Sequence, residues 1–588
     1  MATWHLQTTD TNLALMSETL GIDPFLCKLL ANRGIRTKHR AIKFLKPQAK
    51  FMHDSESLQG LTAAVAYLRE HPHQKLTIYG DYDVDGVCST TILVKGLAPF
   101  VTDIDYYIPH REHEGYGLNR GAIHQLAQAG TEVILACDNG ITAIDEIAYA
   151  NSLGIQVIMI DHHEPVVKKG REHLPEAIII NPKQSKCDYP FKALCAAGLS
   201  YKFIQAWYQQ AGETLSEQLD RELLIFAAIA TLCDVVDLQD ENRILVRRGL
   251  EALRETVDNL GLAALILEKS IVDVNEEAIG FTIGPCINAC GRLDSAMKGV
   301  ELFLSTERVH ATALAKEVSA LNDRRKTLTQ EAMDLILDQD THAQTAHQDD
   351  VIVLYEPHIH ESVAGIVAGR IKDMMYKPTL ILTAGEQGAK GSARSIEGYN
   401  IHGALSRFTH LFDKFGGHEM AAGLSLQPER IEALRLGLNE DYQAQNLSFQ
   451  EQIVIDELMP LSQATYRLCE TIDVMRPFGK ANEAPVFATR AVQLQGLRMI
   501  EAKNTLIFTF LTEDNRAIKA LCFGRGNIDK LIHAVYNQYD EATAEQIFSG
   551  ILRHVAPQFD IAYHVELNHY RGQSNVQLRL KDFRLCAT

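Results

Sequence analysis

Acidic and histidine residues gather at four places in the first half of the chain. In chain order they are Asp81, Asp83, Asp85, Asp138, Asp161, His162, His163 and Asp234. Carboxylates this close in the segment GDYDVDG destabilise one another unless a cation neutralises them. Carboxylate oxygens joined by imidazole suit Mn2+ or Mg2+ better than a metal that prefers thiolates. Two such ions about 3.5 to 4 Å apart would form a site that hydrolyses a phosphate ester.

Each signal also has an ordinary structural explanation when it stands alone. Alternating aspartates occur in turns and calcium loops, although the glycine spacing of an EF-hand is missing here. Asp138 precedes Asn-Gly, which favours a tight turn, and the histidine pair could be a surface dipeptide. Asp234 could end a helix or be a core carboxylate. Because all four signals follow apolar runs of strand or helix length, the sequence favours one metal site.

Short apolar runs alternate with helix-like segments from Lys75 onward. KLTIYG, EVILAC, QVIMI and EAIII are each of strand length and end in polar residues or glycine. This alternation is typical of a parallel α/β sheet with helices between its strands. Ligands of such sheets bind at the carboxyl ends of the strands, which is where the acidic residues fall.

The length of 588 residues predicts about three or four domains. A helical preface is expected over 1–50, and an α/β domain with a mainly helical extension over 51–337. The polar tract 338–350 lacks periodicity and predicts a linker. A second α/β unit is expected over 351–448, and alternating β-rich segments predict a small barrel over 449–588.

Composition excludes several classes of protein. With 46% hydrophobic and 22% charged residues the chain is neither disordered nor fibrous. Acidic residues outnumber basic ones 75 to 57, and a net charge of −18 argues against binding nucleic acid through a broad basic face. No apolar run reaches the roughly 18 to 20 residues of a membrane helix, and the N-terminus lacks a secretory pattern. Eleven cysteines without a CxxC pair predict no disulfide framework, so a reducing cytoplasm is expected.

The order GDYDVDG, CDNG, DHH and CDVVD resembles the DHH phosphoesterase superfamily. Within it, the chain is similar to the single-strand-specific exonucleases through GPCINACGRLDSA, LNDRR, ESVAGIVAGRI, GSARS, KFGGHEMAAGLSL and RPFGKANEAPVF. The resemblance covers nearly the whole chain. It implies a DHH domain with a parallel sheet, a long helix, a DHH-associated domain and a C-terminal OB-fold. The implied activity is 5′-to-3′ hydrolysis of single-stranded DNA by two metal ions, releasing 5′-mononucleotides in repair and recombination.

The resemblance also implies a role for each acidic or histidine residue. Asp83 and Asp138 hold one ion, while Asp85, Asp138, His162 and Asp234 hold the other, so that Asp138 bridges the two. Asp81 is a ligand or a close partner of one, and Asp161 orients the imidazoles. His163 contacts the scissile phosphate or transfers a proton to the leaving oxygen.

Small residues around two basic side chains predict phosphate contacts in the second α/β unit. Glycine and serine next to Arg394 let backbone N–H groups and a guanidinium converge on a phosphate, and two glycines before His418 permit close approach. A surface turn and a helix start are the alternatives. The resemblance implies a clamp for the 5′ end and the first phosphates, made of Ser392, Arg394, Gly416, Gly417 and His418.

Three further positions belong to the implied cleft. Asn288 and Arg292 are expected in it, whereas Arg370 could equally be a structural ion-pair partner. Cys286 follows Gly-Pro where many members have an arginine, so one phosphate contact is lost or supplied by another residue.

Two alternative functions stay open. One is a phosphodiesterase of short RNA or cyclic dinucleotides, against which the length and the extra β domain argue. The other is an inactive scaffold, against which the complete ligand set argues. The implied partner is single-stranded DNA, and a single-strand binding protein and a helicase are candidate protein partners. The protein is expected to be a monomer and not to bind a membrane. Phe508, Phe510 and Phe523 are interpreted as core residues rather than base-stacking ones.

Overall fold

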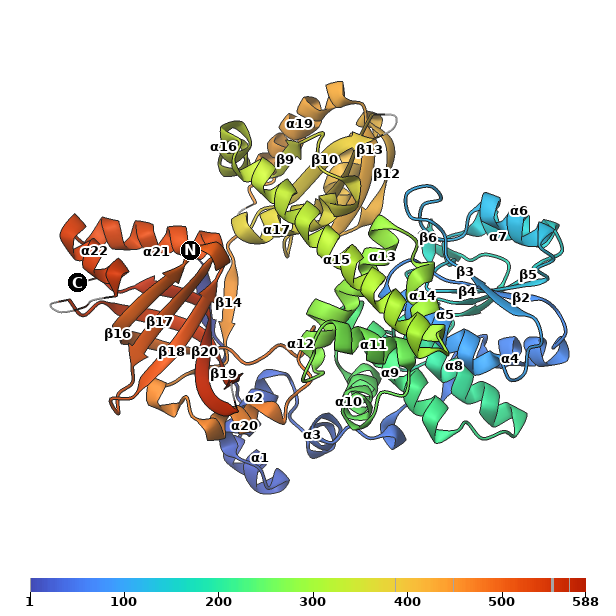
Figure 1. Cartoon of the computed structure of the whole chain (residues 1–588), viewed down its shortest axis with the longest axis horizontal. Helices are drawn as coiled ribbons and strands as arrows, with labels where there is room; N and C mark the ends of the chain where they lie inside the picture. The colour runs from blue at the N-terminus through green and yellow to red at the C-terminus, as the bar shows by residue number, and fades with distance from the viewer. Residues whose placement is uncertain are drawn as a thin grey trace.

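A computed structural model describes residues 2–385, 388–447, 449–550, 552, 555–570 and 572–587, with the backbone alone for 340, 341, 343 and 570. Figure 1 shows three bodies: a sheet with its helices (blue to green), a smaller α/β unit above it (yellow) and a barrel at the left (red). No helix among the described residues is long and apolar enough to cross a membrane.

The first body is built on a five-stranded parallel sheet in the order β3-β2-β4-β5-β8. The strands are β2 Leu76–Tyr79, β3 Ile104–Tyr107, β4 Val133–Cys137, β5 Gln156–Ile160 and β8 Ile178–Ile180. Side chains at alternate strand positions pack into two cores, one on each face of the sheet, because a layer of helices covers each face. The four predicted strands are present. The fifth, β3, was not predicted because its sequence IDYY is half polar and lies at the sheet edge.

Helices cover both faces of this sheet and continue into a helical extension, as predicted. On one face lie α5 Val84–Leu97 and α8 Ala196–Ala211, and on the other α6 Arg120–Gln128 and α7 Ile144–Ser152. The extension comprises α9 Glu217–Cys233, α10 Asp240–Glu255, α11 Leu260–Glu268, α12 Glu276–Ala278, α13 Gly284–Leu293, α14 Met297–Leu304 and the 30-residue α15 Arg308–Leu337.

The predicted linker over 338–350 is wrong. Residues Asp340–Gln348 form helix α16, whose buried Ala346 packs in the same apolar cluster as Met333 and Ile352. Among the side chains of α16 that the structure describes, Ala346 alone is buried, so the tract carries little apolar periodicity from which a helix could be predicted.

The second α/β unit has a mixed five-stranded sheet in the order β12-β13-β11-β10-β9. Its elements are β9 Ile352–Tyr355, α17 Glu361–Met375, β10 Thr379–Gly385, β11 Gly388–Arg394, β12 Phe412–His418, β13 Ala421–Leu426 and α19 Ile431–Ala444. GSARS therefore lies on β11 and FGGH on β12, so neither the turn nor the helix start considered for them is correct.

The third body is a closed barrel. Strands β16 Phe487–Ile500, β17 Thr505–Leu511, β18 Ala517–Phe523, β20 Gln573–Leu585 and β19 Gln558–Tyr570 pair in that order, and β19 pairs back to β16. Phe508 and Phe510 are fully buried in its core, as predicted, whereas Phe523 is 54% exposed and contradicts the prediction. Phe523 lies at the end of β18, where the strand leaves the barrel wall for α21 Arg525–Gln538.

The N-terminal segment belongs to the barrel rather than standing before the first domain. Helices α1 Leu13–Leu20, α2 Pro24–Asn32 and α3 Lys38–Leu45 form as predicted, but Thr3–Leu6 is a strand, β1, paired in parallel with β14 Gln452–Ile455. Apolar residues of α2 share one core with the barrel strands. The domain boundaries inferred from the sequence stay predictions.

One buried arginine joins the barrel segment to the helical extension. Arg243 of α10 is 2% exposed, and its guanidinium donates to the carbonyl oxygens of Phe44, Met475, Arg476 and Pro477 at 2.8 to 3.3 Å. The Phe44 ring centroid lies 3.7 Å from its guanidinium carbon. Charged donors to carbonyls are among the stronger hydrogen bonds, so this contact fixes the two bodies together.

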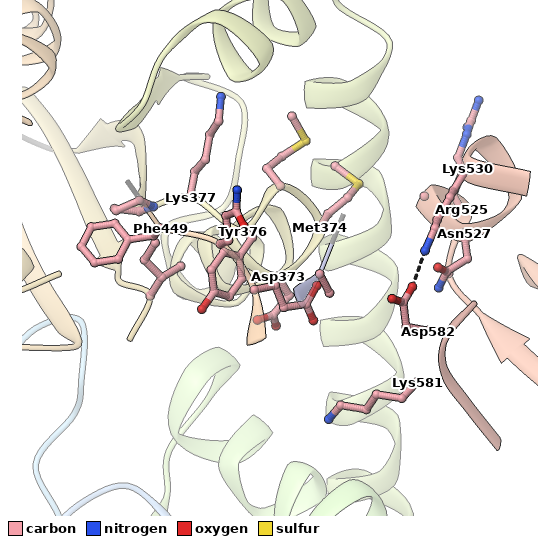
Figure 2. A pocket seen from close by; sticks show the side chains of 18 of the residues that line it. Asp373, Met374, Tyr376, Lys377, Phe449, Arg525, Asn527, Lys530, Lys581 and Asp582 are labelled. Carbon is pink, nitrogen blue, oxygen red and sulfur yellow. Dashed lines mark hydrogen bonds and ion pairs between the residues drawn. The ribbon is translucent and has the colours of Figure 1, made fainter. Parts of the chain in front are cut away.

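A cavity of about 880 Å3 lies between the end of α17 and the barrel (Figure 2). Met374, Tyr376 and Lys377 line one side, and Arg525 and Lys530 the other. Lys530 is paired with Asp582. The exposed Phe523 belongs to this lining, so the cavity has both an aromatic and a charged wall.

Candidate metal and nucleic-acid site

The carboxyl ends of the parallel strands bring the predicted acidic residues together. Asp81, Asp138 and Asp161 follow β2, β4 and β5, and Asp138 N–H donates to the Ile160 carbonyl at 3.0 Å. Asp138 has a φ of +64°, a conformation that only aspartate, asparagine and glycine adopt readily. The tight entry into α5 requires Gly86, because a Cβ there would lie 2.3 Å from the Asp81 carbonyl oxygen.

Helix ends supply the remaining carboxylates. Asp83 caps α5 by accepting from the N–H groups of Asp85 and Gly86, and Asp234 caps the C-terminus of α9. Both oxygens of Asp85 accept backbone N–H groups at the start of α8, at 2.7 and 2.8 Å. These contacts fix the carboxylate of Asp85 in place.

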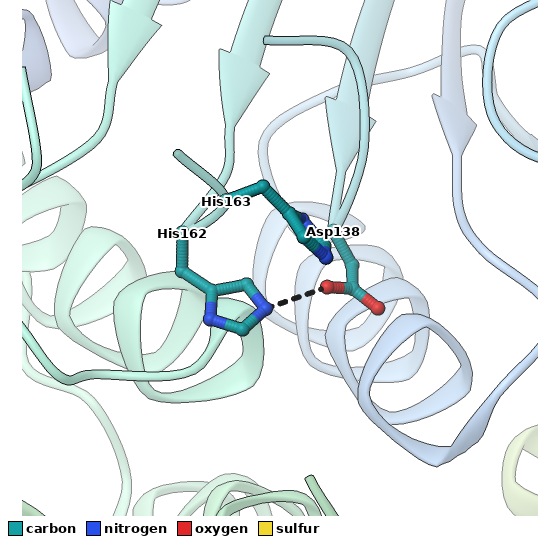
Figure 3. A group of neighbouring side chains, drawn as sticks. All are labelled: Asp138, His162 and His163. Atoms are coloured by element: carbon teal, nitrogen blue, oxygen red, sulfur yellow. Dashed lines mark ion pairs between the residues drawn. The ribbon is translucent and has the colours of Figure 1, made fainter. Parts of the chain in front are cut away.

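Three groups of donor residues could each hold a metal ion, because the ligand atoms within each group lie within 4.8 Å of one another. They are Asp138, His162 and His163; Asp85, His162 and Asp234; and Asp81, Asp83 and Asp138. Nε2 of His162 lies 3.2 Å from Asp138 Oδ1 (Figure 3) and 3.7 Å from oxygens of Asp85 and Asp234. Asp138 and His162 each belong to two of the three groups. The ligand assignment itself stays a prediction.

The protonation behaviour of these groups fits a pair of divalent cations. Burial, followed by repulsion from Asp85 and Asp83, raises the pKa of Asp234 to about 8, and burial also raises that of Asp85 to about 6. Burial lowers the pKa of His162 to about 3, which leaves its imidazole neutral with a free lone pair. Among the described residues, Asp81 Oδ1, His162 Nε2 and Asp234 Oδ2 are buried without a hydrogen-bond partner. Cations would satisfy all three atoms.

Metal binding should therefore release protons. The carboxylates must lose their protons to coordinate an ion, and the raised pKa of Asp234, about 8, keeps it largely protonated at neutral pH. We expect the affinity for Mn2+ to rise with pH up to about 8 and then to level off. Titration calorimetry in buffers of different ionisation enthalpy measures the protons released, and zero release at pH 6.5 would contradict this assignment.

Asp161 is hydrogen-bonded to both members of the histidine pair, and its role in orienting them stays a prediction. Its Oδ1 accepts from the N–H groups of His162 and His163 and from Nδ1 of His163 at 2.8 Å, and its Oδ2 accepts from the N–H of Ile141. Burial raises the pKa of Asp161, but the bond and charge of His163 outweigh burial and lower it to about 2. For His163, burial alone would lower the pKa of the imidazole. The hydrogen bond and the charge of Asp161 outweigh burial, so the pKa of His163 is raised to about 9. His163 is therefore an imidazolium at neutral pH.

Replacing Asp161 by asparagine should lower activity about 10- to 100-fold, the usual loss when the partner of a site histidine is removed. Without the carboxylate the pKa of His163 falls, so the deficit should be larger at pH 8 than at pH 6. Single-turnover rates across this range measure both effects. Asp188→Asn, an exposed position, is the control. A deficit independent of pH would contradict the imidazolium.

Residues predicted for the substrate cleft line the mouth of the site. Asn288 and Arg292 border a pocket of about 170 Å3 together with Asp83, Asp85 and Asp234. Arg292 Nη1 donates to the Ser362 carbonyl at 3.0 Å, and this bond links α13 to α17. Burial, and then the charges of Arg111 and Arg394, lower the pKa of Arg292 to about 9.

The strand register brings the predicted clamp residues of the second unit into rows. Arg394, Ala421 and His418 are paired across β11, β13 and β12, as are Ser392, Gly423 and Gly416. Residues two apart share a face, so Ser392, Arg394, Gly416 and His418 lie on one side of the sheet, and Gly417 lies between the rows. Arg394 and Ser392 lie directly under α17, where a Cβ at Gly365 would be 2.7 Å from the Arg394 guanidinium. Gly416, Gly417 and His418 are exposed on the edge strand.

Arg370 is exposed on α17, and within the described part of the chain it has no ion-pair partner. The alternative of a structural ion pair is therefore not supported. The positive charge of Arg370 contributes to the lowered pKa of Arg325 on α15, so Arg370 lies near the helices that border the site.

Sequence reasoning missed two residues in the loop between β3 and α6. Tyr116 OH donates to the Asp138 carbonyl at 3.1 Å and lies 3.4 Å from the His163 ring nitrogens. Arg111 stacks over Tyr82 at 5.0 Å and lines the metal pocket. Glu114 ties the loop down by accepting from Tyr107 and His110. The available signal in HREHEGYGL is a basic segment followed by a tyrosine between two glycines, shortly after the half-polar strand β3.

Comparison with known proteins places the chain in a family. Residues 75–231 match the DHH family, N-terminal domain, residues 348–442 the DHHA1 domain and residues 455–582 the RecJ OB domain. The single-stranded-DNA-specific exonuclease RecJ of Salmonella typhimurium is 30% identical over 586 residues, covering 95% of this chain and 96% of that protein. The chain belongs to the RecJ family.

Other RecJ proteins agree with this placement. RecJ of Bacillus subtilis is 34% identical over 90% of this chain, which spans 66% of that longer relative, slightly less than two thirds. A crystal structure of RecJ from Thermus thermophilus in complex with Mn2+ matches with a TM-score of 0.80 at 24% identity, over 99% of this chain and 79% of that one. The predicted fold class, a DHH domain, a DHH-associated domain and an OB barrel, is thereby confirmed.

Proposed function

We propose that this chain is a metal-dependent exonuclease that removes 5′-mononucleotides from single-stranded DNA in the 5′-to-3′ direction, in DNA repair and recombination in the cytoplasm. The observation that carries the proposal is the convergence of the three donor groups beside a mouth lined by Arg111 and Arg292. Its RecJ relatives are named single-stranded-DNA-specific exonucleases, which supports the substrate and the activity.

Two places for ions are part of the proposal. Asp83 and Asp138 would hold one ion, and Asp85, Asp138, His162 and Asp234 would hold the other, with Asp81 next to the first; the three donor groups support this arrangement. Bound there, Mn2+ or Mg2+ supplies charge neutralisation at the phosphodiester and activation of a water molecule. The Mn2+ in the Thermus relative supports the choice of ion.

His163 is the proton donor of this scheme. Nδ1 of the imidazolium is held by Asp161, so the proton available to the substrate is on Nε2. That proton can pass to the 3′ oxygen that leaves when the phosphodiester is cleaved. Tyr116 OH, 3.4 Å away, helps to hold the ring in this orientation.

Arginine side chains bind the DNA strand, which the net negative charge of the protein would otherwise repel. Arg292 and Asn288 face the reacting phosphate, while Ser392, Arg394 and the edge strand with Gly416, Gly417 and His418 bind the 5′ end. Guanidinium groups suit this task because they bind phosphate oxygens through two parallel hydrogen bonds.

Strands labelled at either end test the proposal. With Mn2+ or Mg2+, a 5′-labelled single strand should release labelled mononucleotide at once, and a 3′-labelled strand should shorten progressively. Late release from the 5′-labelled strand would contradict the direction. Cleavage of dinucleotides or cyclic dinucleotides in preference to long strands would instead favour the phosphodiesterase alternative.

The proposed protein partners are a single-strand binding protein and a helicase, and the proposed state is a monomer. Sedimentation at micromolar concentration should give a single species near 65.5 kDa. Pull-down with each purified partner tests the two contacts separately.

A further inference from the structure

One segment of this acidic chain is strongly basic. Residues 24–53 carry eight lysines and arginines and no acidic residue, whereas the rest of the chain carries 49 basic and 75 acidic residues, a net charge of −26. Such an asymmetry of charge is typical of a surface that binds a polyanion. The net charge of the whole protein therefore does not describe this segment.

Five of the eight basic side chains make up a surface that we call the α3 face. Lys28, Arg33 and Lys43 are paired with carboxylates of Glu457, Asp456 and Asp240. The other five are exposed and have no ion-pair partner among the residues that the structure describes; they are Arg36, Lys38, Arg40, Lys46 and Lys50. Their charges are therefore available to an anion from solution.

The first turn of α3 has the charge that a helix disfavours at this end. Lys38, His39 and Arg40 occupy the turn, which holds no acidic residue. Because a helix carries a partial positive charge at its N-terminus, basic side chains there are unfavourable and acidic ones are preferred. Residues that break such a rule without a gain in stability are expected at functional sites. An anion bound at this turn would relieve the repulsion.

Contacts on its other side hold α3 in place. Ala41 is fully buried, the Phe44 carbonyl accepts from Arg243 at 2.8 Å, and Lys43 Nζ donates to Asp240 at 2.6 Å. The helix packs against α10 where the barrel meets the helical extension (Figure 1), and it contributes no residue to the metal pocket. The α3 face is therefore a rigid surface, which loses little conformational entropy when it binds a ligand.

The side chains of the α3 face distinguish between two forms of DNA. Sites for single strands combine basic residues with aromatic rings on which the bases stack. On α3 the exposed large apolar residue is Ile42, while Phe44 and the nearby Phe51 are half-buried. A surface that offers charges without aromatic rings suits a duplex, whose bases are already stacked and whose two backbones present phosphates on the outside.

We propose that the α3 face binds the phosphate backbone of double-stranded DNA, at the place where the strand under digestion passes from its single-stranded 5′ part into a duplex. The inference rests on the proposed function, which supplies a strand whose 5′ end enters the metal pocket. A substrate held at both places binds more tightly than its single-stranded part alone, because the second contact is then intramolecular.

A DNA hairpin with a single-stranded 5′ tail, compared with the tail alone, tests this proposal. Both are labelled at the 3′ end and titrated in EDTA over a range of salt, with fluorescence anisotropy as the readout. Arg40→Gln/Lys46→Gln should raise the Kd for the tailed hairpin about 10-fold. The slope of log K against log salt should fall in magnitude by about 2, since each phosphate contact on a duplex contributes about 0.9. The Kd for the tail alone should not change.

Arg308→Gln/Lys316→Gln is the matched control. It also removes one arginine and one lysine from exposed positions, on α15, where neither has an ion-pair partner in the part of the chain that the structure describes. Both Kd values should equal those of the native protein. Arg40→Lys/Lys46→Arg keeps the two charges and should keep the affinity for the tailed hairpin, because attraction to a backbone depends on charge.

Several outcomes would overturn the inference. Unchanged binding of the tailed hairpin by Arg40→Gln/Lys46→Gln would do so, as would an equal loss in Arg308→Gln/Lys316→Gln. An equal loss on the tail alone would assign the face to the single strand. Displacement of the hairpin by poly-glutamate at a lower concentration than by duplex DNA would assign it to an acidic protein segment.

Failure of the proposed function is a separate result, in which the native protein with Mn2+ degrades no single strand. The titrations in EDTA do not depend on that activity. Thermal unfolding of each variant establishes that the fold is intact, as expected for side chains on the surface.

Discussion

Replacing Asp138 by asparagine should reduce nuclease activity by at least about a thousandfold, because charge stabilisation by bound metal contributes several kcal/mol to such reactions. Asp138 belongs to two of the three donor groups, so its loss weakens both predicted ion sites. Asparagine is the suitable replacement because it tolerates the φ of +64° that Asp138 adopts. Alanine at this position would add backbone strain to the loss of charge.

Mn2+ titration calorimetry and the end-labelled strand assay measure the two consequences for Asp138→Asn. The control is Asp145→Asn, an exposed aspartate in the first turn of α7. Retained activity with normal Mn2+ binding in Asp138→Asn would show that this carboxylate does not bridge the ions.

Replacing Arg243 by methionine should lower the free energy of unfolding by about 3 to 5 kcal/mol, since hydrogen bonds from charged groups are worth about 1.5 to 3 kcal/mol each and are only partly additive. The methionine keeps the apolar contact with Phe44 but removes the charged donor from the carbonyls of Met475 and Pro477, which then keep only their bonds from the Asn482 amide. Urea unfolding followed by circular dichroism measures the loss.

Arg247→Met is the matched control for this change. Arg247 is on the same helix and also donates to the Arg476 carbonyl, but its side chain is 32% exposed and pairs with Glu251 on the surface. A surface pair of this kind is worth at most about 1 kcal/mol. Equal losses in the two variants would mean that burial of Arg243 is not what anchors the barrel.

The acidic part of the site could be predicted from the sequence because it is local. Asp81, Asp138 and Asp161 each end a buried strand, and parallel strands bring such ends to one edge whatever the detailed packing. The pattern of apolar runs predicted four of the five strands for the same reason. Arg111 and Tyr116 could not be found, because the half-polar edge strand that positions their loop has no clear periodicity.

Contacts that depend on distant segments were beyond sequence reasoning. The bond from Asn322 to Cys286 joins two helices, and Arg243 joins residues more than 200 positions apart. The pairing of β1 with β14 is set by the barrel and not by any feature of TWHL itself. In the same way, Phe523 is of a residue type that usually packs in a core, but it is exposed because it lies where its strand leaves the barrel.

The pairing of Thr3 with Gln452 has a consequence for how the protein is made. A ribosome adds roughly 5 to 20 residues per second, so about 20 to 90 seconds separate the emergence of β1 from that of its partner strand. During that time the apolar face of α2 has no core to enter, although the first α/β body can already fold. Newly made chains should therefore bind general chaperones through their first 45 residues, and a chain cut before β14 should keep that segment accessible to protease.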